Sequence, residues 1–250
     1  MDKDVLKKAQ DVFSESWERL AQTDPEFLEI AANFAQGEAV QASKLTEKER
    51  MLCVLSALLG CQGMGAFRNV LHTALDAGIE PAAVKEVLYQ AAAYLGIGRV
   101  HDFLLAANEI MERHGVRLPL APQRTTDENT RFEKGLAKQV ALFGEGMAKR
   151  QTDAPPLRCN INRWLADNCF GDYYTRTGLN DRERELITFC FILAQGGCES
   201  QLRGHTAGNF GVGNGKERLY SAVEQCMPYI GYPRSLNAMA VIDEIAAKAE

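Results

Sequence analysis

The sequence predicts an all-α protein built from two helical repeats. Apolar residues recur at intervals of three and four along most of the chain, and the alternation typical of β-strands is scarce. The breaks between the apolar runs coincide with Gly and Pro. The third observation is an internal repeat, because residues 45–110 align with residues 179–245.

The two copies share residues in a common order. In the first part of the alignment the matched pairs are Leu45/Leu179, Glu49/Glu183, Arg50/Arg184, Leu52/Leu186 and Leu59/Leu193. After short adjustments the pairs are His72/His205, Ala74/Ala207, Gly78/Gly211, Gln90/Gln225, Tyr94/Tyr229, Gly96/Gly231, Arg99/Arg234, Glu109/Glu244 and Ile110/Ile245. Each copy is therefore expected to form the same helical unit.

The second copy predicts four helices in succession. Asn180 or Asp181 can cap the first helix, which Gly196-Gly197 ends, and the second helix runs from about Cys198 to Asn209. A glycine-rich turn precedes a third helix that reaches about Cys226, and the segment 228–233 is expected to break the chain before the last helix. The first copy repeats this plan, with Gly60, Gly78 and Gly96 as the expected breaks.

The segment 118–127 has the proline and polar content of a linker. We place the domain boundary near residue 125, which gives a first domain of residues 1–124 and a second of residues 125–250. Each half also begins with an extra helical segment, at 5–21 and at 132–149, that we expect to pack on its own repeat.

Composition and charge exclude several function classes. The formal charge of −5 over 250 residues is spread along the chain, so nucleic acid is not an expected partner. The longest apolar run, 189–194, is far short of the ~20 residues that cross a bilayer, and the charged N-terminus does not resemble a secretory signal. Seven cysteines without a CxxC pair fit reduced thiols and predict no zinc-finger site. We therefore expect a cytoplasmic protein without membrane contact.

One helix face of the second copy carries a candidate catalytic cluster. Cys198, Gln201 and His205 are spaced to project from the same side of a helix. Glu185, on the preceding helix, is expected to approach the imidazole of His205, and a histidine oriented by a carboxylate can transfer protons near neutral pH. The alternatives are that His205 is a core or interface histidine, that Glu185 is an acid at a helix N-terminus or on an exposed face, and that Cys198 is a small buried residue.

The second copy resembles the carboxymuconolactone decarboxylase family. The resemblance lies in the runs Tyr174-Thr-Arg-Thr-Gly-Leu-Asn-Asp-Arg-Glu-Arg-Glu-Leu-Ile-Thr188 and Gln201-Leu-Arg-Gly-His205, in Gly211, and in Pro228-Tyr-Ile-Gly-Tyr-Pro-Arg-Ser-Leu-Asn-Ala238. It covers about residues 174–245, and residues 45–110 carry weaker versions of the same motifs. It implies all-α, alkylhydroperoxidase D-like domains that assemble into rings of three or six. The tandem chain would then form a pseudo-dimer of two such repeats and associate further as a homo-oligomer.

The resemblance implies one of two chemistries. The decarboxylase branch acts on a carboxylated lactone from aromatic catabolism without a metal or an organic cofactor, and here His205 would transfer the proton while Glu185 orients it. The alkylhydroperoxidase D-like branch uses a CxxC pair before the histidine, but in this sequence only Cys198 matches, and Gln201 occupies the second cysteine position. Because a dithiol cycle needs both sulfurs, we expect a lyase. Two alternatives stay open, an antioxidant, peroxiredoxin-type activity through Cys198 and a non-catalytic binder of small molecules.

Substrate binding is expected from groups near this helix. An acidic substrate calls for cationic or hydrogen-bonding partners, and the candidates are Gln201, Arg203, Arg234, Tyr229, His72 and Arg68. Each arginine has the alternative of a solvated surface position. The first copy departs further from the family, since Arg68 stands at the Gln201 position, Gly65 at the Cys198 position and Met51 at the Glu185 position.

Overall fold

The computed structural model describes residues 3–13 and 16–249, and no strand occurs among them. The first half contains α1 (Lys3–Phe13), α2 (Trp17–Thr23), α3 (Pro25–Asn33), η2 (Phe34–Glu38), α4 (Ala39–Ala42), α5 (Glu47–Cys61), α6 (Met64–Asp76), α7 (Pro81–Leu95) and α8 (Ile97–Arg113). The second half contains α9 (Arg131–Phe143), α10 (Gly146–Thr152), η3 (Pro156–Arg158), α11 (Cys159–Trp164), η4 (Leu165–Tyr174), α12 (Asp181–Gln195), α13 (Glu199–Gly211), α14 (Lys216–Ile230) and α15 (Tyr232–Ala249). The predicted all-α pseudo-dimer of two repeats is confirmed.

The central helices α5 and α12 begin with the same local structure. The Thr46 side chain accepts the backbone N–H of Glu49, and the Asn180 side chain accepts that of Glu183. In both cases the backbone N–H of the cap residue donates to the carboxylate of that glutamate. The pair of bonds satisfies two N–H groups that would otherwise be unpaired at the helix start. Asn180, and not Asp181, is therefore the cap of α12.

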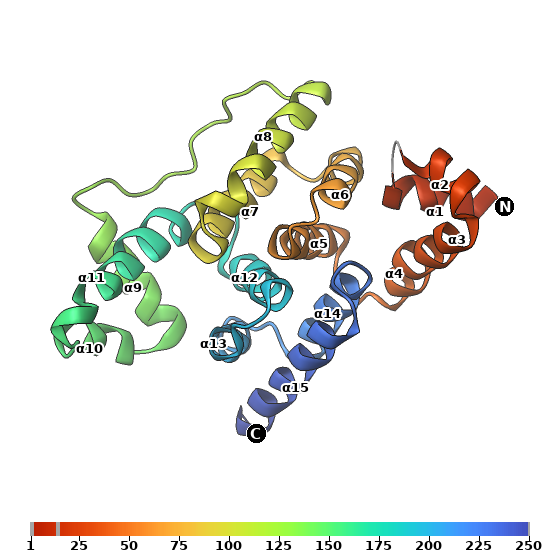
Figure 1. Cartoon of the computed structure of the whole chain (residues 1–250). Helices are drawn as coiled ribbons and strands as arrows, with labels where there is room; N and C mark the ends of the chain where they lie inside the picture. Colours follow the sequence, from red (N-terminus) through yellow and green to blue (C-terminus); the bar gives the residue numbers. More distant parts are fainter. Residues whose placement is uncertain (1–2, 14–15, 250) are drawn as a thin grey trace.

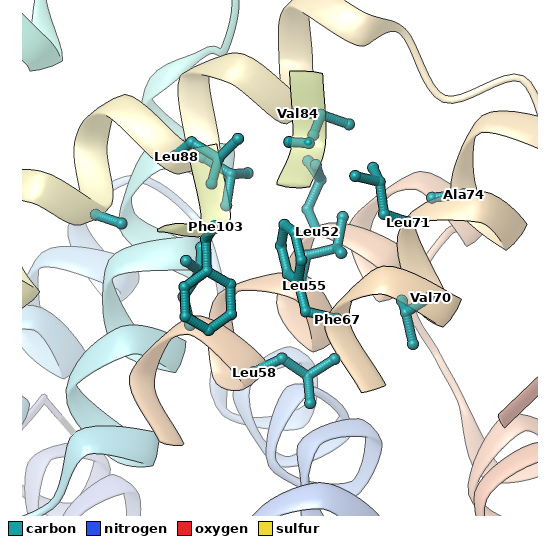
Figure 2. Close-up of a cluster of buried hydrophobic side chains, with 14 of the residues drawn as sticks. Leu52, Leu55, Leu58, Phe67, Val70, Leu71, Ala74, Val84, Leu88 and Phe103 are labelled. Atoms are coloured by element: carbon teal, nitrogen blue, oxygen red, sulfur yellow. The ribbon is translucent and has the colours of Figure 1, made fainter. Parts of the chain in front are cut away.

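Two buried clusters of apolar side chains form the core, one for each repeat. Figure 2 shows part of the first cluster, in which α5, α6, α7 and α8 contribute Leu52, Leu55, Leu58, Phe67, Val70, Leu71, Ala74, Val84, Leu88 and Phe103. The second cluster is built mainly from α12, α14 and α15. Phe191 belongs to the first cluster and Cys53 to the second, so each central helix contributes to both cores.

The two repeats exchange contacts across the α5–α12 pair. Helix α7 of the first half packs on α12 and η4 of the second, and α14 of the second half packs on α5 and α4 of the first. Figure 1 shows α5 and α12 at the centre, with α1–α4 and α9–α11 on opposite sides of the molecule. Each repeat is therefore completed by a helix of the other.

The structure shows where the predicted helices end. Gly60 is the second-last residue of α5, which ends at Cys61, and the expected break in segment 228–233 falls at Gly231, because α14 continues through Pro228 to Ile230. The expected helix 132–149 is divided at Gly144 into α9 and α10. The expected helix 5–21 is described as α1 and α2, and its residues 14 and 15 lie outside the described part of the chain. The domain boundary near residue 125 stays a prediction.

Within the described residues, no helix combines the length and the hydrophobicity that crossing a bilayer requires.

Gly60 is required where α5 meets α12. A Cβ atom at Gly60 would lie 2.7 Å from the Ala194 Cβ and 2.7 Å from the carbonyl oxygen of Phe191. Both neighbours belong to a buried helix, so the helices would have to separate.

We predict that Gly60→Val lowers the free energy of unfolding by about 1–3 kcal/mol, because it overpacks this crossing. Urea denaturation followed by circular dichroism measures the loss. Gly204→Ala is the matched control, since Gly204 lies inside α13 and an added Cβ there meets nothing within 4 Å. Equal midpoints for the Gly60 variant and the wild type would contradict the close approach.

Candidate active site

The predicted pair of His205 and Glu185 is present. His205 Nδ1 lies 2.9 Å from Glu185 Oε2, and the side chains are 12% and 0% exposed. The pair joins α13 to α12, as the sequence predicted for neighbouring helices. Gly208 makes the approach possible, because a Cβ there would lie 2.6 Å from the same carboxylate oxygen.

The other oxygen of Glu185 accepts a hydrogen bond from a buried tyrosine. Tyr174 Oη donates to Glu185 Oε1 at 2.9 Å and lies 2.8 Å from Thr188 Oγ1 and 2.9 Å from Tyr94 Oη. Burial raises the pKa of Tyr174 and of Tyr94 well above the usual value of a phenol, so both hydroxyls keep their protons as donors. The buried carboxylate thus receives a hydrogen bond on each oxygen, from Tyr174 and from the His205 ring.

The network continues through α7 of the first repeat to a buried ion pair. Gln90 Nε2 donates to Thr188 Oγ1 at 2.7 Å, and the side-chain oxygen Oε1 of Gln90 accepts from Arg184 Nη1 at 2.7 Å. Arg184 in turn lies 3.0 Å from Glu86, and both side chains are fully buried. The hydrogen bonds thus form a chain that runs from the Arg184 guanidinium through Gln90, Thr188 and Tyr174 to Glu185. This chain links the site to the interface between the repeats.

Aromatic rings flank the imidazole. The Tyr94 and Phe143 rings stand edge-on to His205, with centroids 5.3 and 5.4 Å away. Its Nε2 atom has no hydrogen-bond partner among the described residues, and the side chain as a whole is 12% exposed. With Nδ1 fixed on Glu185, the arrangement presents one ring nitrogen for proton exchange.

Cys198 and Gln201 do not join this network. Cys198 is the N-cap of α13, its sulfur accepts a bond from Gln195 Nε2 at 3.0 Å, and it lines a hollow of about 360 Å³ that His205 does not line. Gln201 is exposed, one helical turn before His205. Cys198 therefore lies apart from His205, although the spacing predicted both on one helix face.

The two candidate arginines of the second repeat, Arg203 and Arg234, already have hydrogen-bond partners. Arg203 Nε donates to Glu244 Oε2 at 2.8 Å on the exposed surface. Arg234 donates to the carbonyl oxygen of Ala194 near the end of α12 and borders the same hollow as Cys198. Neither arginine contacts the His205–Glu185 pair.

The remaining candidates lie in the first repeat. His72, Arg68 and Tyr229 line a cavity of about 1370 Å³, in which Tyr229 comes from α14 of the second repeat. Tyr229 was expected beside His205, but Tyr94, its counterpart in the first copy, occupies that place. Each histidine is thus accompanied by the tyrosine of the other repeat.

Several residues of the network around Glu185 and His205 were not predicted from the sequence. These residues are Tyr94, Tyr174, Thr188, Gln90 and Phe143. Tyr174 and Thr188 lie at the two ends of the motif run quoted above, and Gln90 and Tyr94 were matched between the copies. Gln90 and Tyr94 reach the site from α7 of the other repeat, and the sequence gives no signal of that contact. Among the described residues, no group of three or more His, Cys, Asp or Glu is arranged to hold a metal ion.

We predict that Glu86→Gln lowers the free energy of unfolding by about 3–5 kcal/mol, because it leaves the Arg184 guanidinium buried without its carboxylate. Guanidinium chloride denaturation measures this. Glu244→Gln removes the exposed partner of Arg203 and should change stability by less than ~1 kcal/mol. Similar small losses in both variants would show that the buried pair does not hold the repeats together.

Comparison with known proteins identifies the repeats. Residues 25–109 and 160–244 both match the carboxymuconolactone decarboxylase family. A 4-carboxymuconolactone decarboxylase of Acinetobacter baylyi (strain ATCC 33305 / BD413 / ADP1) is 27% identical over 120 residues, which cover 48% of this chain and 89% of that protein. The relative thus corresponds to about one half of this chain. Because the two matched segments make up more than half of the sequence, the protein belongs to the carboxymuconolactone decarboxylase family.

Proposed function

We propose that the protein is a lyase that decarboxylates a small carboxylated lactone or a related acid, with His205 as the group that transfers the proton. One observation carries this proposal, the imidazole fixed by Glu185 at 2.9 Å with its other nitrogen without a hydrogen-bond partner among the described residues. The relative from Acinetobacter baylyi is a 4-carboxymuconolactone decarboxylase, which supports the choice of substrate class.

The step requires one proton. When the substrate loses CO₂, the C–C bond to the carboxylate breaks, and the electron pair left on the lactone takes up a proton. Protonated His205 supplies it from Nε2 and becomes neutral, and solvent then returns the proton. Glu185 stabilises the charged ring before the transfer, and Tyr174 holds the carboxylate in place.

Binding of the substrate would use the exposed end of this site. Gln201 lies one turn before His205 on α13 and is exposed, and we propose that its amide contacts the substrate. The roles of Arg203 and Arg234 in substrate binding stay predictions, because both are engaged elsewhere. We also propose the cytoplasm and aromatic catabolism as the setting.

We predict that His205→Asn lowers kcat for 4-carboxymuconolactone by about a hundred- to ten-thousandfold, the usual contribution of a general acid or base. Glu185→Gln should give a smaller loss, because the imidazole stays but loses its charged partner. The measurement is CO₂ release at saturating substrate. His101→Asn is the control, since His101 pairs with Asp102 on the surface and should retain full activity. Unchanged turnover in His205→Asn would remove the proposal.

The redox alternative predicts a different outcome. If Cys198 works as a peroxidatic thiol, the wild type reduces an organic hydroperoxide and Cys198→Ser does not, while decarboxylation is absent. That combination would replace the lyase assignment.

A homo-oligomer is proposed as well. Leu157, Ile161 and Trp164 in η3 and α11 are 96%, 57% and 59% exposed, and such neighbouring apolar side chains are typical of a surface that another protein covers. A second copy of the chain is the partner that the family resemblance implies.

We predict that Trp164→Glu shifts the protein to a smaller species in sedimentation velocity, because a charge replaces an apolar contact. Leu105→Glu, at a 55% exposed position of α8, should leave the distribution unchanged. A monomeric wild type would contradict the oligomer.

A further inference from the structure

The segment that joins the two halves borders a cavity on the first repeat. After α8 the chain runs as an extended loop before α9 begins (Figure 1). Residues 118–123 of this loop line a cavity of about 450 Å³ together with α7 and α8, and His205 does not line it. Since small-molecule sites usually have roughly 300–1,000 Å³, the cavity is large enough for a ligand.

One face of α7 and one face of α8 form the base of this cavity. Lys85 and Tyr89 are one turn apart on α7, and Leu104, Asn108 and Glu112 follow one another at the same interval on α8. The loop contributes mainly apolar residues, which are Leu118, Pro119, Leu120, Ala121 and Pro122. The cavity therefore combines polar groups on the helices with an apolar cover.

Lys85 is buried there without a paired carboxylate. The residue is 7% exposed, and its Nζ donates to Oδ1 of Asn108. Among the described residues it forms no ion pair, and two of its three N–H donors have no partner. Burial lowers the pKa of Lys85, although the charge of Glu112 opposes this shift. A buried ammonium with only an amide partner is a place where an anion is stabilised.

Arg176, which lies between η4 and α12, adds a second positive charge to the lining. Its Nε lies 2.9 and 3.0 Å from the two oxygens of Glu86, and its guanidinium lies over the Tyr89 ring, 4.9 Å from the centroid. Arg184 contacts the same carboxylate, so Glu86 can compensate only one of the two guanidinium groups. The Arg176 side chain is 16% exposed, and its Nη atoms have no hydrogen-bond partner among the described residues.

The two acidic lining residues do not cancel this charge. Glu86 is fully buried and is shared by Arg176 and Arg184. Glu112 is exposed, so solvent and salt screen its carboxylate. The buried charges around the cavity are therefore positive in sum.

We propose that this cavity binds a small organic anion, with its acidic group at the Lys85 ammonium and the Arg176 guanidinium and its apolar part between Tyr89 and the leucines of the loop. The site is separate from His205 and does not depend on the reaction proposed there. A small molecule is favoured over a protein partner, because a folded protein could not reach a lysine that is only 7% exposed.

The first test removes the charge of Lys85. Isothermal titration calorimetry with benzoate should show one site in the wild type, and Lys85→Met should weaken it by about ten- to a hundredfold, the usual worth of a charge-assisted hydrogen bond. Lys44→Met is the matched control, since Lys44 is 67% exposed and pairs with Glu217 on the surface. Without benzoate, Lys85→Met should unfold at a temperature no lower than the wild type does, because it removes a buried cation that lacks a counter-ion. A lysine with only a structural role would give a lower temperature.

The second test supplies the missing carboxylate from the protein itself. Asn108→Asp keeps the size of the side chain and places a negative charge beside Lys85. Benzoate affinity should fall at least about tenfold, because the ammonium is then neutralised and the new carboxylate repels the ligand. Asn129→Asp makes the same change of charge at an exposed position outside the cavity and should bind benzoate as the wild type does. If Lys85→Met does not fold, Asn108→Asp decides alone.

Three results would overturn the proposal. They are the absence of benzoate binding to the wild type, an affinity that Lys85→Met or Asn108→Asp leaves unchanged, and a loss of binding in His205→Asn, which would place benzoate at the site of the proposed reaction. His205→Asn is expected to bind benzoate with the affinity of the wild type while its decarboxylation fails. The two readouts therefore separate this proposal from the function proposed for His205.

Discussion

The buried ion pair between Arg184 and Glu86 is the interaction on which the site geometry depends. It joins α12 of the second repeat to α7 of the first, with both side chains fully removed from solvent. A guanidinium buried there without its carboxylate is strongly unfavourable, so the two helices are held in one relative position. Gln90 is fixed by the same guanidinium and in turn fixes Thr188 and Tyr174, whose hydroxyl orients Glu185. The direction of the His205 ring thus follows from an interaction between the repeats.

The exchange of helices also decides which side chains surround each histidine. Tyr94 reaches His205 from α7, and Tyr229 reaches the cavity of His72 from α14. Neither repeat by itself contains all of the residues that line its own site. This explains why the polar network and the apolar core are continuous across the centre of the molecule, where Phe191 and Cys53 lie in the cluster of the opposite repeat.

Much of the fold and the central pair of the site could be predicted from the sequence. Helix periodicity, the cap at Asn180 or Asp181 and the placement of Glu185 and His205 on successive helices depend on residues near one another in the chain. The repeat is visible because the two copies keep matched residues in the same order. Contacts between the repeats leave no periodic signal, so the contact of Tyr94 with His205 and the place of Tyr229 in the cavity of His72 could not be predicted. Cys198 was grouped with His205 by helical spacing, which fails because Cys198 precedes the helix with φ −129° and ψ 40°.

Joining two repeats in one polypeptide has an evolutionary consequence. In an assembly of identical subunits, replacing the glutamate at the Glu185 position would alter every site at once. After duplication and fusion, Met51 can stand at that position in one half while Glu185 persists in the other. Selection can then act on the two histidines and their surroundings independently, as it does on paralogous genes, although neither half is free to diverge where it supplies a tyrosine to its neighbour.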